Sequence, residues 1–183
     1  MARKSSALPP VLYTVGHSTR SFDELLELLR AHGVTQLADV RTVPKSRRYP
    51  HFAIDALSRS LPAAGIAYRH FPGLGGLRKP RRDSPNSAWR NEGFRGYADY
   101  MGTGEFEQAL DDLLEFASST KQHTVIMCAE AVWWRCHRQL VADALVARGV
   151  EVRHIMTTAS APAHRLSDFA RVDEGKVSYR ALI

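Results

Sequence analysis

Short runs of β-branched and aromatic residues alternate along the chain with amphipathic segments, and this alternation limits the possible folds more than any other feature. Strands are expected at residues 11–15, 36–40, 66–70, 123–128 and 150–155. Helices are expected at residues 22–32, 52–64, 94–101, 104–117 and 135–148. Because strands that alternate with helices pair in parallel, the pattern predicts an α/β fold. We expect a mainly parallel sheet of about five strands with helices on both faces, a three-layer sandwich.

Two local signals are the sharpest. Ser21 and Glu24 form a capping box at the start of the first helix, and Gly33 follows its last periodic residue. The run at 123–128 is apolar throughout, which is typical of a strand buried on both faces.

The length of 183 residues fits one domain, so we expect residues 1–183 to form a single α/β unit with a C-terminal tail at 156–183. Residues 71–93 are a long basic loop rich in proline and glycine, and loops of this length are usually functional or mobile. Hydrophobic residues make up 44% and charged residues 24% of the chain, which excludes disordered, collagen-like and coiled-coil proteins. No apolar run approaches a membrane span, the N-terminus lacks a secretory pattern, and there are only two cysteines. The sequence therefore predicts a cytoplasmic protein with reduced thiols and no membrane partner.

Positive charge is concentrated in one part of the chain. Residues 41–95 contain twelve Lys and Arg against three acidic residues, whereas the remainder contains thirteen basic and sixteen acidic residues. A local excess of this kind favours an anionic partner: a phosphate, a nucleotide or a nucleic acid. A solvated basic loop that aids solubility is the alternative, and the sequence leaves both interpretations open.

Polar residues follow several of the expected strands, at the edge where α/β sheets bind ligands. His17 follows the first strand, Asp39 and Arg41 lie around the end of the second, and Glu130 follows the strand at 123–128. Parallel strands would bring these residues to one edge. His17 could then transfer a proton, and Asp39 or Glu130 could orient it or act as a base. Arg41 is a candidate to hold phosphate oxygens.

The segment from Cys128 to Arg138 carries the most chemical groups. Cys136 lies near the start of an expected helix, where free N–H groups and the helix dipole favour a thiolate, and His137 stands beside it. Cys136 and His137 are therefore catalytic candidates, and Arg138 is a candidate to bind the anion. The alternative is that both cysteines are packed core residues. A metal site would use Cys128, Cys136, His137 and His17. The C-x₇-C-H spacing matches no short zinc motif and the adjacency of Cys and His counts against such a site, so no metal and no cofactor are predicted.

A basic loop at 41–52 is a second candidate binding segment, because aromatic residues are interleaved with its arginines. Ser46 and Arg47 are its candidates for substrate binding, since arginine pairs with phosphate through two hydrogen bonds. Gly75 and Gly76 would allow a ligand close to the backbone, although they form neither a dinucleotide fingerprint nor a P-loop. A surface loop with solvated arginines is the alternative.

Several short motifs occur together and in order: residues 14–18 (TVGHS), 39–47 (DVRTVPKSR), 74–76 (LGG), 100–101 (YM), 128–130 (CAE) and 136–138 (CHR). This set resembles domain-of-unknown-function family 488 over most of the chain. The resemblance implies a small prokaryotic-type α/β protein, supplies no activity, and directs attention to the motif residues His17, Asp39, Arg41, Ser46, Arg47, Glu130, Cys136, His137 and Arg138. Rhodaneses are similar in parts of the expected fold, which is an analogy only.

These observations predict an enzyme that acts on a phosphate-bearing substrate, a nucleotide or nucleic acid, at the C-terminal edge of the sheet. A non-catalytic nucleic-acid-binding module, using Tyr49, Phe52 and Trp89 beside the basic segment, is one alternative. A structural or adaptor protein, in which buried Asp–Arg pairs only fasten the chain, is the other.

The most specific geometric expectation concerns two strands. Strands 36–40 and 123–128 should be parallel neighbours or be separated by one strand. Arg41 and His137 should then border one crevice, into which the helix at 135–148 directs free N–H groups that hold an anion.

Overall fold

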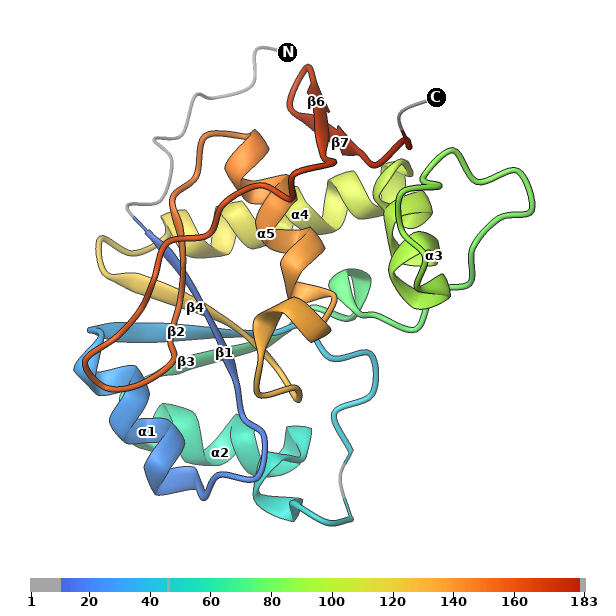
Figure 1. Cartoon of the computed structure of the whole chain (residues 1–183). Helices are drawn as coiled ribbons and strands as arrows, with labels where there is room; N and C mark the ends of the chain where they lie inside the picture. The colour runs from blue at the N-terminus through green and yellow to red at the C-terminus, as the bar shows by residue number, and fades with distance from the viewer. Residues whose placement is uncertain (1–10, 46, 182–183) are drawn as a thin grey trace.

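The computed structural model describes residues 11–45 and 47–181, and its centre is a five-stranded sheet (Figure 1). The strands are β1 (Leu12–Gly16), β2 (Val34–Asp39), β3 (Ala67–His70), β4 (His123–Cys128) and β5 (Val152–His154). They pair in parallel in the order β3-β2-β4-β1-β5, so the predicted α/β class and parallel sheet are confirmed. The pairing of β2 with β4 confirms the expectation for strands 36–40 and 123–128.

Helices cover both faces of the sheet, as predicted. They are α1 (Phe22–Ala31), α2 (Ile54–Ala63), α3 (Glu92–Met101), α4 (Gly104–Ser118) and α5 (Arg138–Ala147). In Figure 1, α1 and α2 lie below the sheet, and α4 and α5 lie above it. Successive side chains of β4 point to opposite faces: Val125 and Met127 join the core under α1 and α2, and Ile126 and Cys128 join the other core.

The capping box predicted at the first helix is present, because the Ser21 side chain accepts from the Glu24 N–H while the Glu24 carboxylate accepts from the Ser21 N–H. Gly33 follows the helix with a positive φ of 63°, which favours glycine. The helix expected at 135–148 begins later. A 3₁₀ turn at Trp133–Arg135 comes first, and Cys136 is extended before α5 starts at Arg138.

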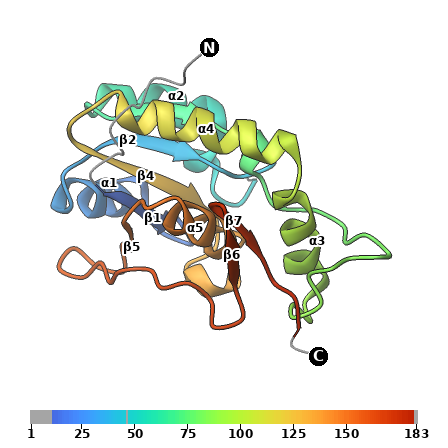
Figure 2. The same ribbon diagram turned by 90° about the horizontal axis from the view of Figure 1, so that it is seen from above.

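The loop predicted at 71–93 is fastened to α3 along much of its length, and Figure 2 shows the green loop beside that helix. Tyr97 and Tyr100 of α3 donate to backbone carbonyls at the start of the loop. Asp99 accepts from the Ser84 hydroxyl and the Asn86 amide further along it. Gly96 permits this close approach, because a Cβ there would lie 2.3 Å from a loop carbonyl oxygen.

The C-terminal segment forms a hairpin of β6 (Arg171–Asp173) and β7 (Lys176–Ser178) and returns to α5. Asp143 of α5 is fully buried and accepts hydrogen bonds from His164, from Ser167 and from the Tyr179 hydroxyl. Across the described part of the chain, no helix combines the length and the apolar character that a membrane crossing requires.

Candidate functional site

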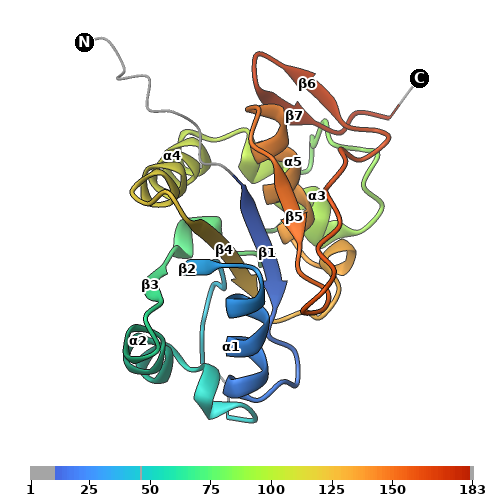
Figure 3. The ribbon, with the colours of Figure 1, turned by 90° about the vertical axis from the view of Figure 1, so that its left-hand side faces the viewer.

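Three strands end at the same level, and this brings the candidate residues together. Gly16 of β1 stands opposite Cys128 of β4, and Asp39 of β2 stands opposite Met127. Figure 3 shows β1 and β4 with their arrowheads toward one end of the molecule. The residues that follow these strands therefore meet at the carboxyl edge of the sheet, where parallel sheets bind ligands.

A cavity of about 470 Å³ opens at this edge and is called the thiol cavity below. The residues of its wall that matter here are Arg41, Tyr97, Cys128, Arg135, Cys136 and His137. Arg41 and His137 thus border one cavity, although they are 96 positions apart in the sequence. The Tyr97 hydroxyl donates to the Leu74 carbonyl, and its ring packs 5.2 Å from the ring of His137.

Two thiols and an imidazole face one another in the thiol cavity. His137 Nδ1 lies 3.6 Å from Cys136 Sγ and 3.9 Å from Cys128 Sγ. His137 Nε2 lies 3.1 Å from the Val40 carbonyl oxygen, which only accepts hydrogen bonds, so Nε2 carries the proton and donates. Nδ1 then presents its lone pair to the two sulfur atoms.

The backbone changes direction between the two adjacent residues of this cluster. Cys136 is extended at φ −130° and ψ 148°, whereas His137 is helical at φ −56° and ψ −14°. This change allows the adjacent side chains of Cys136 and His137 to point into the same part of the thiol cavity. From their adjacency in the sequence we expected them to point apart. The Arg138 N–H is directed at Cys136 Sγ over 3.5 Å.

The pKa values of the two thiols are shifted in opposite directions. A hydrogen bond from Cys128 lowers the pKa of Cys136 far below its ordinary value against the opposing effect of burial, and the nearby Arg138 charge adds to this lowering. The pKa of Cys128 is raised by the same hydrogen bond and by burial. Cys136 is therefore the thiolate of the pair and Cys128 the thiol.

The expectation of free N–H groups at the start of α5 is not met at its first residues. The Arg138 N–H faces the Cys136 sulfur, and the Gln139 N–H donates to the Cys136 carbonyl. The helix end therefore supports the thiolate instead of presenting these donors to a separate anion.

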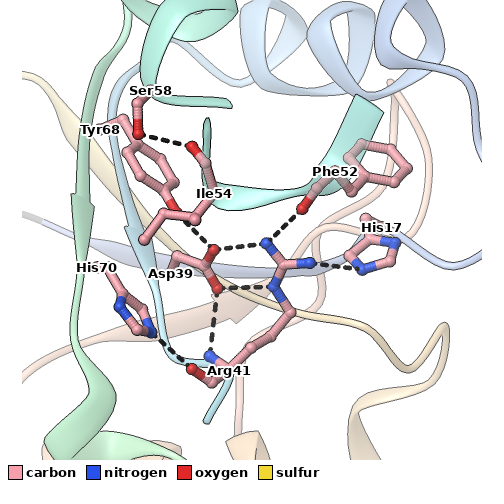
Figure 4. Close-up of polar contacts among 8 residues, drawn as sticks. All are labelled: His17, Asp39, Arg41, Phe52, Ile54, Ser58, Tyr68 and His70. Atoms are coloured by element: carbon pink, nitrogen blue, oxygen red, sulfur yellow. Dashed lines mark hydrogen bonds and ion pairs between the residues drawn. The ribbon is translucent and has the colours of Figure 1, made fainter. Parts of the chain in front are cut away.

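Asp39 and Arg41 form a buried ion pair in which Arg41 borders the cavity and Asp39 lies behind it (Figure 4). Arg41 Nε and Nη2 donate to the two carboxylate oxygens of Asp39 at 2.8 and 2.6 Å, and Tyr68 donates to the same carboxylate. Asp39 is fully buried and Arg41 is 6% exposed. Asp39, predicted as a catalytic candidate, thus lies where it orients Arg41. Tyr68 was missed because only the pairing of β3 with β2 brings it here.

His17 completes this network. Its Nδ1 donates to the Ser18 carbonyl, so Nε2 accepts from Arg41 Nη1 over 3.3 Å. The imidazole stacks on Phe52 at 4.2 Å between ring centres. Burial, together with the positive charge of Arg41, lowers the pKa of His17 to about 4, so its imidazole is neutral near pH 7.

Arg138, predicted to bind an anion, is instead an internal support. It is 2% exposed, and its guanidinium donates to the Glu130 carbonyl and to the Thr14 hydroxyl. It thereby holds the loop after β4 against β1. Gly16 allows this contact, because a Cβ there would overlap the Glu130 carbonyl oxygen.

A second cavity, of about 450 Å³, adjoins the first and is called the basic cavity. His17, Ser18, Lys45, Arg48 and Tyr49 contribute to its wall. Both cavities are bordered by Arg41, Val43, Ala129 and Glu130. The Glu130 side chain is exposed on this common border.

The remaining predicted residues are placed as follows. Gly76 lies against the imidazole, where a Cβ would be 3.0 Å from His137 Nδ1, and Gly75 lies against Thr42. Arg47 is exposed, and Ser46 lies outside the described residues. Lys45, Arg48 and Arg135 were not among the predicted site residues, since exposed cations carry no signal that separates a cavity wall from open surface.

The aromatic residues proposed to stack on bases are largely engaged elsewhere. Phe52 is fully buried under His17. Trp89 packs against Phe94, Phe169 and Tyr179. Tyr49, the third of these residues, is half-buried and borders the basic cavity. The aromatic support for a non-catalytic nucleic-acid-binding module therefore rests on Tyr49.

The family model of the domain of unknown function DUF488 matches residues 21–145 of the chain. No curated protein and no solved structure matches the chain. The family match covers α1 through most of α5, and so includes every residue of the thiol cavity named above. The chain therefore belongs to the DUF488 family.

Proposed function

We propose that the protein is an enzyme that acts on a phosphate-bearing substrate, a nucleotide or a short stretch of nucleic acid, bound across the thiol cavity and the basic cavity. The observation that carries this proposal is that a cluster of reactive groups directly adjoins a cluster of cations. Cys136 and His137 supply the first, and Arg41, Lys45 and Arg48 supply the second. A cysteine with a strongly lowered pKa in a concave site, such as Cys136, is typical of a catalytic centre.

The basic cavity would hold the phosphate. Lys45 and Arg48 are exposed there, so their charges are available to a ligand, and the Ser18 and Thr19 side chains offer hydroxyl groups beside them. Arg41 is different, since its guanidinium is already fixed by Asp39. A fixed cation between the cavities orients a phosphate at little entropic cost, while the exposed pair increases affinity and the rate of encounter.

The thiol cavity would hold the part of the substrate that reacts. Phe94, Val43 and Leu77 add apolar surface to its wall, which suits a base or a sugar beside the phosphate. Glu130 borders both cavities, and from this position its carboxylate can accept or donate a proton. His17 is a poor acid–base candidate because its lone pair accepts from Arg41 and its pKa is lowered to about 4.

Binding measurements with a matched pair of variants test the proposal. Nucleoside phosphates, sugar phosphates and short single-stranded oligonucleotides are titrated into the protein by calorimetry at several salt concentrations. Lys45→Ala/Arg48→Ala should weaken binding, and the slope of log K against log salt should fall by up to about 1.4 if both residues contact phosphates of a single strand. Arg171→Ala/Lys176→Ala removes the same charge from the exposed hairpin and should bind like the wild type.

Turnover of any ligand that binds is then followed by chromatography. Products should form with the wild type and with the hairpin variant, and should be lost in Cys136→Ala. Two results would contradict the proposal: no compound of the panel binds, or the two double variants bind equally well.

A further inference from the structure

The Cys128–Cys136–His137 cluster has the composition of a metal site. The three donor atoms, two Sγ and one Nδ1, all lie within 4.8 Å of one another. Both cysteines are buried and His137 is half-buried, so the donors meet at the inner wall of the thiol cavity. Thiolate sulfur and imidazole nitrogen are the ligands that zinc and other thiophilic cations prefer.

The separations between these atoms match a shared tetrahedral ion. With Zn–S near 2.3 Å and Zn–N near 2.1 Å, nitrogen and sulfur on one zinc ion are about 3.6 Å apart. His137 Nδ1 lies 3.6 Å from Cys136 Sγ and 3.9 Å from Cys128 Sγ. The side chains thus stand near the required positions without any change of backbone.

Further contacts orient the donors. Metal-bound histidine usually donates its other N–H to a carbonyl or carboxylate, which fixes the ring and its tautomer. His137 does this through Nε2 to the Val40 carbonyl at 3.1 Å. Cys136 Sγ faces the Arg138 N–H at 3.5 Å, a donor that suits a thiolate ligand. Gly76 leaves room beside Nδ1.

We propose that Cys128, Cys136 and His137 bind a thiophilic divalent cation, with zinc as the first choice, and leave its fourth coordination position open to the thiol cavity. Three protein ligands with one open position are characteristic of catalytic zinc, and Cys₂His is one of the known sets. The sequence alone did not predict this site, because the ligands combine a strand end with two adjacent residues that a change of backbone direction brings to one side. Hard cations such as Mg²⁺ and Ca²⁺ prefer oxygen ligands and do not fit.

The metal site would change the chemical role of Cys136 within the proposed function. A bound cation can activate a water molecule or polarise a phosphoryl oxygen at its open position. Cys136 would then act as a ligand, and its sulfur would not attack the substrate. Metal binding itself does not rest on the proposed substrate and is measured without it.

The test uses reduced, metal-free protein and Zn²⁺ alone, titrated in competition with a chromogenic chelator, and Co²⁺ as a spectroscopic probe. The wild type should bind one Zn²⁺ per chain and unfold at a higher temperature with it. The Co²⁺ form should show thiolate-to-metal charge transfer and the visible bands of a tetrahedral ion. Cys136→Ser and His137→Gln should each lose stoichiometric binding, whereas His123→Gln, at the opposite end of β4, should keep it.

Gly76→Ala provides a variant that removes no ligand. Its added Cβ would lie 3.0 Å from His137 Nδ1, so zinc affinity should fall while the circular dichroism spectrum and the melting temperature of the metal-free protein stay near those of the wild type. The proposal is overturned if the wild type binds no Zn²⁺ or lacks the thiolate charge-transfer band. It is also overturned if folded ligand variants bind Zn²⁺ as the wild type does.

The two proposals fail separately. Lys45→Ala/Arg48→Ala should bind zinc normally, since neither residue belongs to the cluster. Zinc binding without any binding of the phosphate panel would retain the metal site and reject the substrate. Binding of the phosphate panel without zinc binding would retain the substrate proposal and reject the metal site.

Discussion

The buried pair of Asp39 and Arg41 allows a quantitative test of what fixes the carboxyl edge of the sheet. In Asp39→Asn the negative charge is lost, while Arg41, which is 6% exposed, keeps its charge. Leaving one partner of a buried pair unmatched costs about 3–5 kcal/mol. For a chain of this size each kcal/mol lowers the melting temperature by roughly 2–4 °C, so we expect a fall of about 6–20 °C.

A double-mutant cycle separates the pair interaction from other effects. Urea unfolding, followed by circular dichroism, is compared for Asp39→Asn, Arg41→Met and the double variant. Because the double variant holds no unpaired charge, its loss of stability should be smaller than the sum of the two single losses by about 2 kcal/mol or more. The reasoning is refuted if Asp39→Asn lies within about 1 kcal/mol of the wild type, or if the single losses add within about 0.5 kcal/mol.

Three further predictions concern other buried groups. Burial holds the pKa of His17 at about 4 and that of His154 at about 3, so below pH 6.5 the unfolded chain binds more protons than the folded one. The free energy of unfolding, measured in urea, should therefore fall by roughly 2 kcal/mol per histidine between pH 7.5 and 5. With chelator present throughout, this dependence on pH should be weaker in His17→Asn than in the wild type. Gly75→Val should lower the melting temperature by several degrees, measured by calorimetry, because a Cβ at this position would lie 2.9 Å from the Thr42 backbone; an unchanged temperature would contradict the close approach. Asp143→Ala should release the C-terminal segment to limited proteolysis while the sheet persists, and resistance equal to the wild type would show that its hydrogen bonds are dispensable.

The fold could be predicted from sequence because its signals are local. The capping box at Ser21, the glycine stop at Gly33 and the apolar run of β4 each act within a few residues. The order of the strands carries no such signal. It depends on which face each crossover covers, so the sequence did not specify that β1 lies between β4 and β5.

The sequence predicted the edge of the sheet at which the site lies, but not which side chains face the cavity. Parallel topology brings strand ends together, so residues after β1, β2 and β4 were expected at one edge. Whether a polar side chain faces a ligand or another part of the protein depends on packing. Arg138 and Asp39 have the chemistry of ligand-binding residues, yet both are buried supports. Their neighbours Arg41 and His137 reach the cavity wall.

The position of β1 in the sheet also has a consequence for biosynthesis. Of the five strands of the sheet, β1 leaves the ribosome first, but both of its neighbours, β4 and β5, are made more than a hundred residues later. At roughly 5–20 residues per second, β1 waits about 5–20 s with both backbone edges unpaired. Pairings over such sequence separations form slowly, because the intervening chain must be ordered first. The nascent protein therefore presents an apolar strand to chaperones, or to other chains, until β4 pairs between β1 and β2.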